Sequence, residues 1–546
     1  MRLARLGAFH QNRLSFVRTL VRRMAREQWR MSAPVRDLDA DGCGTLVYRI
    51  ETPAGPLSFI AFSNDLAPEE RTDCVTAEKW DATFALVGGP VDAEDIARLR
   101  AEVPKQEAGR FTPAELVLSR ANRSVHLFDH VVEALAAGRQ PELGRLLEVG
   151  YLMRTTAVYG NGKFGIADLE RVWRHGVFAL PYQAEMLTVY LARQFSIDLV
   201  EHIAGSRNSN AARLDARSKR VLGVGNATGP GMAPFLVGHP LLVNAWITVR
   251  ETALARVRAV ERPTEKARRR LLLLLDRARG FAGEWNTADD RQQGRIEALR
   301  QELDALRPKV DEAGLLDATH PWDRLFRDTC REASLETQEM LASLLVELYP
   351  ELVDELEMET GADERETMRP EMTIVELKRL IEGRYDWAIH QDYEDKAARH
   401  FFWYRSAEKD EPRLGQRFSE PGSELETPVG IGFLVAELYR AVCARADDAP
   451  DEPIGVFLLA APRWRGIIRR VQSLADFPYA EIRENLIGAG CLPIDLLRCK
   501  LAIIGGTKFD PQSDRTTHIT LFQGAPSMDE LMRPDADDWL FPCFGS

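Results

Sequence analysis

Apolar residues recur at helical spacing through the middle of the chain. They are densest over 182–204, where apolar side chains point almost all the way round a helix axis, as in a buried helix. A second helix is predicted over 113–137, because Thr112 supplies a hydroxyl N-cap, Pro113 occupies N1 and Glu115 occupies N3. The same spacing predicts the other helices of a central body spanning 105–260, at 142–153, 167–175 and 240–260.

Short runs of strand-forming residues near the N-terminus predict a small sheet. Residues 45–51 and 57–63 are separated by the Pro-Ala-Gly-Pro turn at 53–56, and 80–87 offers a third strand. A hairpin alone is marginally stable in water, so these strands must pack on another element. We therefore expect a β-rich region over 34–104, with its antiparallel sheet lying on the helical body.

The region 261–346 is predicted to be a helical hairpin. Its stretch 286–308 carries Leu299 and Leu303 at helical spacing, but it holds too few heptads for a coiled coil. A homodimer formed through this stretch is the alternative to packing within the chain. An acidic and then aromatic and polar connecting region follows, over 347–425.

Strands and helices alternate in the last region, 426–546. The expected strands are 454–460, 501–505 and 518–523, and the expected helices are 428–445 and 462–473. This alternation favours a small α/β domain. The predicted fold class is therefore α+β and mostly helical, with a small N-terminal antiparallel sheet on a helical central body and a C-terminal α/β domain.

Residues 1–33 form a basic head. Eight arginines and one acid, Glu27, occur within 1–31, and apolar residues such as Leu14, Val17 and Val21 recur at helical spacing. A basic amphipathic helix of this kind is typical of a targeting presequence or a membrane-surface helix. The favoured interpretation is an overlong start, because Met31 opens a plausible N-terminus. The head is therefore set aside in predicting the fold.

Composition narrows the class of protein. The 546 residues carry a net charge of −12, which argues against general nucleic-acid binding. No apolar run approaches the roughly 20 residues that span a bilayer, so no transmembrane segment is expected. The seven cysteines are scattered without a CxxC pair, which indicates neither a disulfide framework nor a zinc ribbon. A soluble, multidomain protein of the cytoplasm is the simplest expectation.

Polar residues on the buried helix 182–204 are the candidate catalytic groups. Asp198, Glu201 and His202 lie three or four residues apart, so their side chains share one side of the helix. Burying them is costly unless they are paired or bind metal. They could act as a general base or as metal ligands; the alternative is a structural network with arginines of a neighbouring helix. The sequence identifies no particular metal or cofactor.

Two glycine-containing loops are the candidate anion-binding elements. The loop 159–165 follows Arg154 and contains Lys163, and both cations could hold a carboxylate or a phosphate. The loop 222–231 offers Asn226 and Thr228 to a polar ligand. Neither loop matches a Walker A motif, and Thr228 replaces the third glycine of a dinucleotide fingerprint.

Two weaker patterns complete the candidates. His126, Asp129, His130 and Glu133 share one side of the predicted helix 113–137, but that side faces away from the apolar residues, which favours a solvated polar surface. In the C-terminal region, His518 lies near the glycine-containing turn 505–508, where an open α/β sheet would bind a ligand.

These observations predict a cytoplasmic enzyme that acts on a small anionic metabolite in a pocket of the central body, by acid/base or metal-assisted chemistry. The alternative is a non-enzymatic assembly or scaffold protein that uses the helix 286–308 and the acidic stretch 351–366 as contacts. A third hypothesis is a peripheral membrane protein held by residues 3–24. The expected partner is a small anion and not a nucleic acid.

Overall fold

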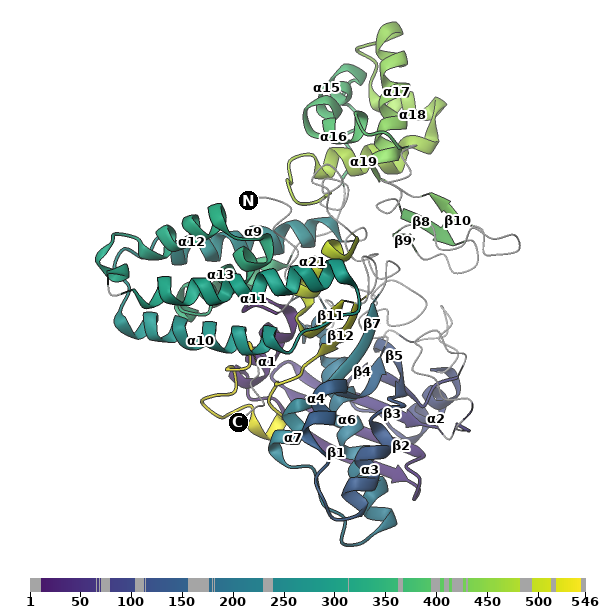
Figure 1. Ribbon diagram of the computed structural model, residues 1–546. Coiled ribbons are helices and arrows are strands. Elements are labelled where there is room, and N and C mark those ends of the chain that lie inside the picture. The colour runs from purple at the N-terminus through teal and green to yellow at the C-terminus, as the bar shows by residue number, and fades with distance from the viewer. Residues whose placement is uncertain are drawn as a thin grey trace. The chain divides into compact units, whose positions relative to one another are not determined.

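The computed structural model describes most of the chain, in two compact units. The described residues are 11–64, 66–67, 69, 79–103, 112, 114–155, 176–178, 180, 182–228, 239–312, 314–361, 367–393, 403–406, 412–414, 426–428, 431–481, 493–511 and 517–541. The sheet unit comprises residues 7–229, 253–358 and 501–546, and the helical unit comprises 1–6, 230–252 and 359–500. Helices outnumber strands, so the fold is mixed α+β and mostly helical (Figure 1).

A nine-stranded sheet forms the centre of the sheet unit, in the order β1-β2-β3-β4-β5-β6-β7-β12-β11. Every neighbouring pair is antiparallel except β6 and β7, which are parallel. The strands are β1 (Arg30–Leu38), β2 (Gly44–Thr52), β3 (Gly55–Ser63), β4 (Ala82–Gly88), β5 (Glu115–Arg123), β6 (Tyr151–Thr155), β7 (Gly223–Thr228), β11 (Gly506–Pro511) and β12 (Thr517–Leu521). The sheet is thus larger than the one predicted, since it takes strands from both ends of the chain.

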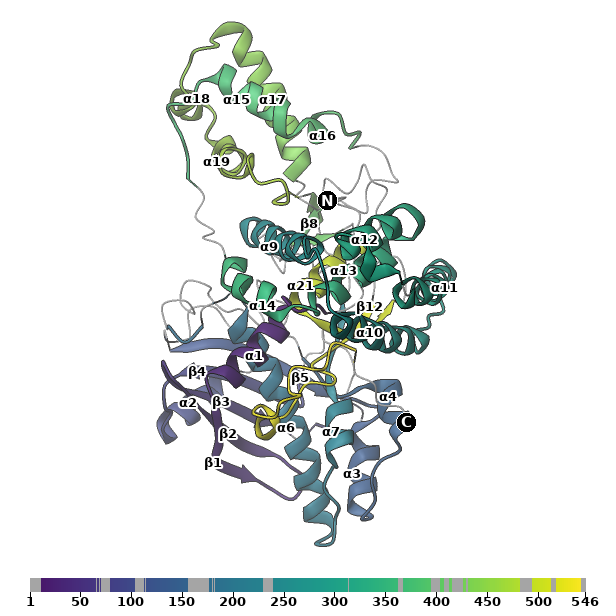
Figure 2. The same cartoon turned by 90° about the vertical axis from the view of Figure 1, so that its left-hand side faces the viewer.

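Helices cover both faces of this sheet (Figure 2). The long helix α6 (Gln183–Arg207) packs on one face, where the rings of Phe84 and Phe195 meet at 5.6 Å, and α3 (Phe128–Ala136) lies beside it. On the other face, α2 (Ala93–Glu102) buries Leu99 against an apolar cluster from β2, β3 and β4. Because the chain passes from β6 through α6 and α7 (Ala216–Val221) to β7, α6 runs antiparallel to both strands.

Residues 11–29, set aside above as part of a separate head, belong to the core. Helix α1 (Phe16–Arg26) buries Val17, Leu20 and Met24 completely. The Arg18 side chain is 0% exposed, and its guanidinium lies 3.1 Å from Glu347 and 3.2 Å from Asp537. The prediction of an amphipathic helix was correct, but its arginines face carboxylates of the same unit.

The basic side of α1 is held by a buried ion network. Arg13 pairs with Glu347 and Asp354, at 3.3 and 2.5 Å, and also with Asp537 at 3.0 Å. Burial opposes the charge of Arg18, but Glu347 and Asp537 outweigh it and raise the pKa of Arg18. Burial likewise opposes the charge of Asp537, whose pKa is nevertheless lowered by Arg18 and the neighbouring arginines. Each charge is therefore stable only in the presence of the others.

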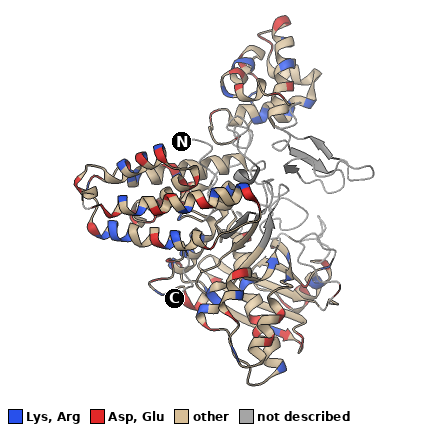
Figure 3. Ribbon diagram, viewed as in Figure 1, with Lys and Arg blue, Asp and Glu red and all other residues tan. Residues whose placement is uncertain are grey.

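The sheet unit also contains a layer of helices that come later in the chain than α1. It consists of α10 (Glu265–Gly283), α11 (Asp290–Asp311), α12 (Pro321–Glu332), α13 (Leu335–Val346), α14 (Pro350–Val353) and the 3-10 helix η5 (Asp354–Thr360), joined by the 3-10 turn η4 (Leu315–Asp317). Leu299 and Leu303 are fully buried within it. Acidic and basic residues alternate on its outer surface (Figure 3), as in the pair Arg279–Asp304 at 2.5 Å. The apolar stripe of α11 is thus covered by its own chain.

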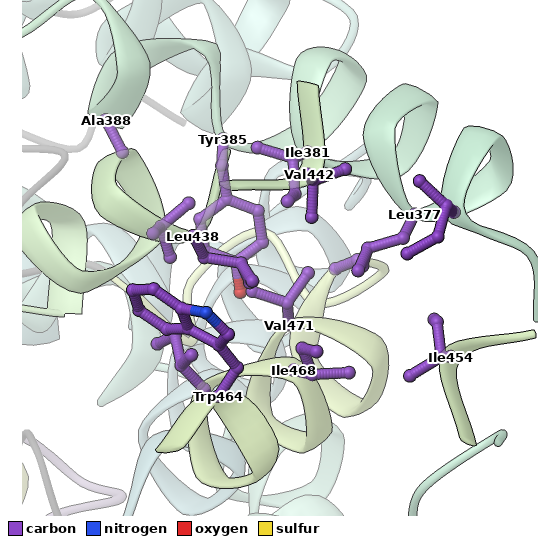
Figure 4. Close-up of a cluster of buried hydrophobic side chains, with 14 of the residues drawn as sticks. Leu377, Ile381, Tyr385, Ala388, Leu438, Val442, Ile454, Trp464, Ile468 and Val471 are labelled. Carbon is purple, nitrogen blue, oxygen red and sulfur yellow. The ribbon is translucent and has the colours of Figure 1, made fainter. Parts of the chain in front are cut away.

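The helical unit has its own core (Figure 4). Tyr385, Leu438, Ile468 and Val471 pack at its centre, and Trp464 lies at its edge. The elements are α15 (Ile374–Arg384), α16 (Asp386–Ile389), α17 (Ile431–Asp448), α18 (Ile454–Ala460), η7 (Pro462–Trp464), α19 (Arg465–Leu474) and a small sheet of order β10-β8-β9, from Glu426–Pro428, Trp403–Ser406 and Pro412–Leu414. Helices α9 (Pro240–Arg258) and α21 (Pro493–Ile504) contain residues of both units.

The first helix of the predicted central body is wrong in part. Residues 113–137 divide into strand β5 and helix α3, and 142–153 divides into α4 (Leu143–Val149) and strand β6. The backbone N–H of Thr112 does bond the Glu115 carboxylate, so the expected local contact forms, but a strand follows it. Gly150 ends α4 with φ of 80°, a left-handed conformation that glycine adopts without strain.

The predicted C-terminal strands are also partly wrong. Residues 454–460 form α18, and 501–504 end α21, because a short apolar run is compatible with either a buried strand or a helix. Residues 223–228, expected within a loop, form β7. The strand expected at 518–523 exists as β12, but it pairs with β7 in the large sheet.

Replacing Arg18 with methionine should destabilise the protein by about 3 kcal/mol, because the carboxylate of Glu347 would remain buried, and that of Asp537 partly buried, without this cation. Urea unfolding at about pH 7 measures the change. The matched control is Arg269→Met, since the Arg269 side chain is 76% exposed and its ion pair with Glu265 is worth little.

The pH dependence of stability, compared between wild type and Arg18→Met, tests the same ion network. Because the pKa of Asp537 is lowered in the folded state, its contribution is present above the ordinary aspartate pKa and is lost as the pH falls through the folded-state value. The difference between wild type and Arg18→Met should therefore shrink as the pH falls below the ordinary aspartate pKa. A difference that stays constant from neutral to acid pH would contradict the charged network.

Candidate functional site

The predicted acid and histidine stripe lies on the C-terminal half of α6, and each side chain has a different partner. Asp198 accepts hydrogen bonds from the Tyr48 hydroxyl at 2.6 Å and the Gln194 amide at 2.9 Å. Glu201 accepts from the Leu214 backbone N–H at 3.1 Å and pairs with Lys219 at 3.0 Å. Asp198 and Glu201 therefore point to separate elements.

His202 has a third, independent partner. Its Nε2 donates to the carbonyl oxygen of Asp39 at 2.7 Å, in the turn between β1 and β2. Burial, and then the negative charge of Asp198, raise the pKa of Tyr48 well above its ordinary value. The three side chains thus connect α6 to β2, to the turn between β1 and β2, and to the segment before β7.

The second stripe begins just before α3 and faces solvent. His126 and Asp129 are exposed, and Arg145 donates to the Nδ1 of His130 at 3.1 Å. Across the described part of the chain, no group of three or more His, Cys, Asp or Glu side chains is arranged to hold a metal ion. A cavity of about 110 Å³ lies near these helices, and its described lining includes Arg123, Asp129 and Arg207 but not the Asp198 stripe.

The predicted anion-binding residues gather at one edge of the large sheet. Arg154 is near the end of β6, and Asn226 and Thr228 are near the end of β7; Lys163 lies outside the described residues. Since β6 and β7 are parallel and Arg154 is in register with Gly225, their carboxyl ends meet. The N-terminus of α6 lies at this edge. The Asp198–His202 segment is about 20 Å away from that N-terminus along the helix axis. The two predicted sets therefore do not share one pocket.

The face that carries Arg154 follows from the strand register. Phe84 contacts α6 and pairs with Ser119, so Ser119 faces α6 and its neighbours Arg120 and Asn122 face away. Asn122 is the register partner of Arg154, and Gly225 is the partner of both Arg154 and Thr520. Residues in register across neighbouring strands share a face. We call Arg120, Asn122, Arg154 and Thr520 the basic row.

The basic row is buried and carries two positive charges. Arg154 is 6% exposed and Arg120 is 8% exposed. The Arg120 guanidinium lies 3.6 Å from the centre of the Trp80 ring, which favours a cation. The ring of Tyr151 covers Gly225 so closely that a Cβ there would approach it to 2.6 Å. Position 225 must therefore be glycine for the sheet to hold Tyr151 beside Arg154.

An exposed imidazole belongs to the same face. His518 lies on β12 two residues before Thr520, and strand alternation gives both side chains the same direction. Sequence reasoning noticed His518 but assigned it to a separate domain. Only the pairing of β12 with β7 brings it to the face that also carries Arg154, and no local sequence signal reports that pairing.

Sequence reasoning missed Glu185, the most deeply buried acid of α6. Its side chain is fully enclosed, and within the described residues its Oε2 has no hydrogen-bond partner. Burial raises its pKa to about 7, against the smaller opposing effect of its own backbone N–H. A charged residue inside the mainly apolar stretch 184–192 was the available signal. Glu185 lies on the α6 side of the sheet, whereas Arg154 faces the opposite side.

Comparisons with known proteins found no relative of the chain, since no family model, curated protein or solved structure matches it. Among the helices whose residues the structure describes, none is long and apolar enough to cross a membrane.

Replacing Glu185 with glutamine should remove a pH dependence of stability. A folded-state pKa of about 7 against an ordinary 4.5 means that the buried carboxyl becomes costly as the pH rises through this window. Above about pH 7, Glu185→Gln should be more stable than wild type by about 2–3 kcal/mol, and the difference should shrink towards about pH 4.5. Urea unfolding at several pH values measures it, and equal stability at alkaline pH would contradict the burial of a charged Glu185.

Proposed function

We propose that the chain is a cytoplasmic enzyme that acts on a small anionic metabolite, a carboxylate or a phosphate, bound at the basic row. The observation that carries this proposal is the presence of two buried arginines and an amide on one sheet face, at the carboxyl ends of a parallel strand pair. In open α/β sheets, ligands bind at the carboxyl ends of parallel strands, and β6 and β7 form the one parallel pair among the described strands of this sheet. The scattered cysteines support the choice of compartment.

The donor chemistry of the row suits an anion. A guanidinium offers a planar fork of N–H groups that matches two oxygens of a carboxylate or phosphate. Arg154 and Asn122 are register partners, so their donors lie side by side on the face. Lys163, the other cation named from the sequence, follows β6 along the chain and lies outside the described residues. A desolvated arginine gains most from a charged ligand, since water does not screen the pair.

Acid/base chemistry is the reaction type that this face supports. An imidazole titrates near neutral pH and can pass a proton in either direction, which makes His518 the candidate general acid or base. The proposal thus moves the catalytic role away from Asp198, Glu201 and His202, which are engaged by Tyr48, Lys219 and Asp39. The competing scaffold hypothesis loses its main contact, because Leu299 and Leu303 are buried within the chain.

Arg154→Met should weaken anion binding by at least roughly tenfold, because it keeps the volume of the side chain but removes the donor fork. Calorimetric titration with inorganic phosphate, succinate and glutamate measures binding. Arg49→Met is the matched control, since Arg49 is an exposed arginine on β2. Unfolding curves for each variant separate lost binding from lost structure.

His518→Ala separates binding from chemistry. With a bound anion as substrate, this variant should keep the wild-type affinity and lose turnover by roughly a hundredfold or more. Wild-type affinity in a folded Arg154→Met protein would overturn the binding site, and wild-type turnover in His518→Ala would overturn the assigned proton donor.

A further inference from the structure

A groove in the helical unit is separate from the proposed anion site. It has a volume of about 500 Å³ and runs between helix α17 and the segment formed by η7 and α19. Ile431, Leu434 and Glu437 line the α17 wall, and Trp464, Gly466 and Ile467 are on the other wall. Ile431, Trp464 and Ile467 are also members of the unit's core (Figure 4 labels Trp464), so the floor of the groove is held by that core.

The groove is apolar inside and basic along one rim. Arg463 lines it and stacks on Trp464, with its guanidinium 4.5 Å from the ring centre, and Arg465 is the next residue along. Both arginines are exposed, and neither forms an ion pair with a described residue. Arg470, by contrast, is neutralised by Glu481, at 2.7 and 2.9 Å. Among the described residues that line the groove, Glu437 on the α17 wall is the acidic one.

Space for an occupant is open at Gly466. A Cβ built on this residue meets no atom within 4 Å, although the residue is the second of helix α19. Gly466 stands in the first turn of α19 and has no side chain to fill the groove that it lines. A small residue here lets another backbone approach Trp464 closely.

We infer that this groove binds an acidic amphipathic helix of a partner protein. Its apolar residues would enter between α17 and α19, and its carboxylates would face Arg463 and Arg465. Charge complementarity identifies this occupant: the exposed Arg463 lines the groove and the exposed Arg465 lies beside it, so this rim attracts the carboxylates of an acidic segment although the net charge of the chain is −12. An α-helix fits because two helices form the walls and its side chains at i, i+3, i+4 and i+7 pack into such grooves.

The side chains of the groove are those that carry binding energy at protein interfaces. Tryptophan and arginine are enriched among the interface residues whose truncation costs the most binding free energy. Such residues are held in well-packed pockets. Trp464 is fixed by the core beneath it, and the Arg463 guanidinium is pre-positioned on its ring. The partner would therefore meet a preformed surface.

The test uses the full-length protein and a fluorescein-labelled helical peptide with leucine at i, i+3, i+4 and i+7 and glutamate beside them. Fluorescence anisotropy should show saturable binding to wild type. Gly466→Leu should weaken it by roughly tenfold or more, because the leucine side chain extends from a residue that lines the groove and whose Cβ would meet no atom within 4 Å. Gly466→Ala is the matched control and should keep most of the affinity.

Reversing the charge at Arg463 tests whether the basic rim contacts the carboxylates of the peptide. Arg463→Glu should lose the glutamate peptide and gain a peptide in which lysine replaces glutamate. Equal binding of the glutamate peptide by wild type and Gly466→Leu would overturn the inference, as would no binding by wild type. Two other results would also overturn the inference, because they identify another occupant of the groove. One is preferential binding of vesicles with anionic lipid, or of single-stranded DNA, through Arg463. The other is self-association of the protein that is lost in Gly466→Leu.

Discussion

The arrangement of the sheet unit depends on the burial of arginines that the N-terminal helix carries into the core. Arg13 and Arg18 on and beside α1 meet Glu347 after α13 and Asp537 near the C-terminus, so three segments distant in sequence share one set of charges. Breaking such a pair leaves a buried charge without compensation. The ionic network therefore acts as a specificity constraint: α1, the helical layer and the C-terminal segment are stable only together.

The N-terminal helix also contacts the start of the central helix. Phe16 of α1 stacks on Tyr182, the residue before α6, with ring centres 5.9 Å apart. Further along, the Tyr190 hydroxyl donates to the carbonyl oxygen of Pro526, and Arg193 donates to that of Leu222. Helix α6 is thus attached to both ends of the chain and to the segment entering β7. Its position sets the parallel pairing of β6 and β7, and this pairing brings Arg154 and Asn226 to one edge.

Sequence patterns predicted the elements that local interactions decide. The buried helix 182–204, the hairpin β2–β3 and an amphipathic helix within residues 3–24, observed as α1 at Phe16–Arg26, were expected because their periodicity and turn residues are local. Residues 454–460 and 501–504 were misassigned as strands, since a short apolar run has the same pattern in a buried strand and a buried helix. The basic row was only partly predictable: Arg154 was named, but Arg120 joins it through strand register, which is a long-range property. His518 was named too, but only the pairing of β12 with β7 brings it to the same face.

The most direct measurement is a crystal structure of the protein grown with the anion that binds most tightly among phosphate, succinate and glutamate. The account predicts that the anion contacts the Arg154 guanidinium on the face of the basic row, with His518 on the same side of the sheet. An anion bound instead beside Asp198, Glu201 and His202 would contradict the account and restore that stripe as the functional site.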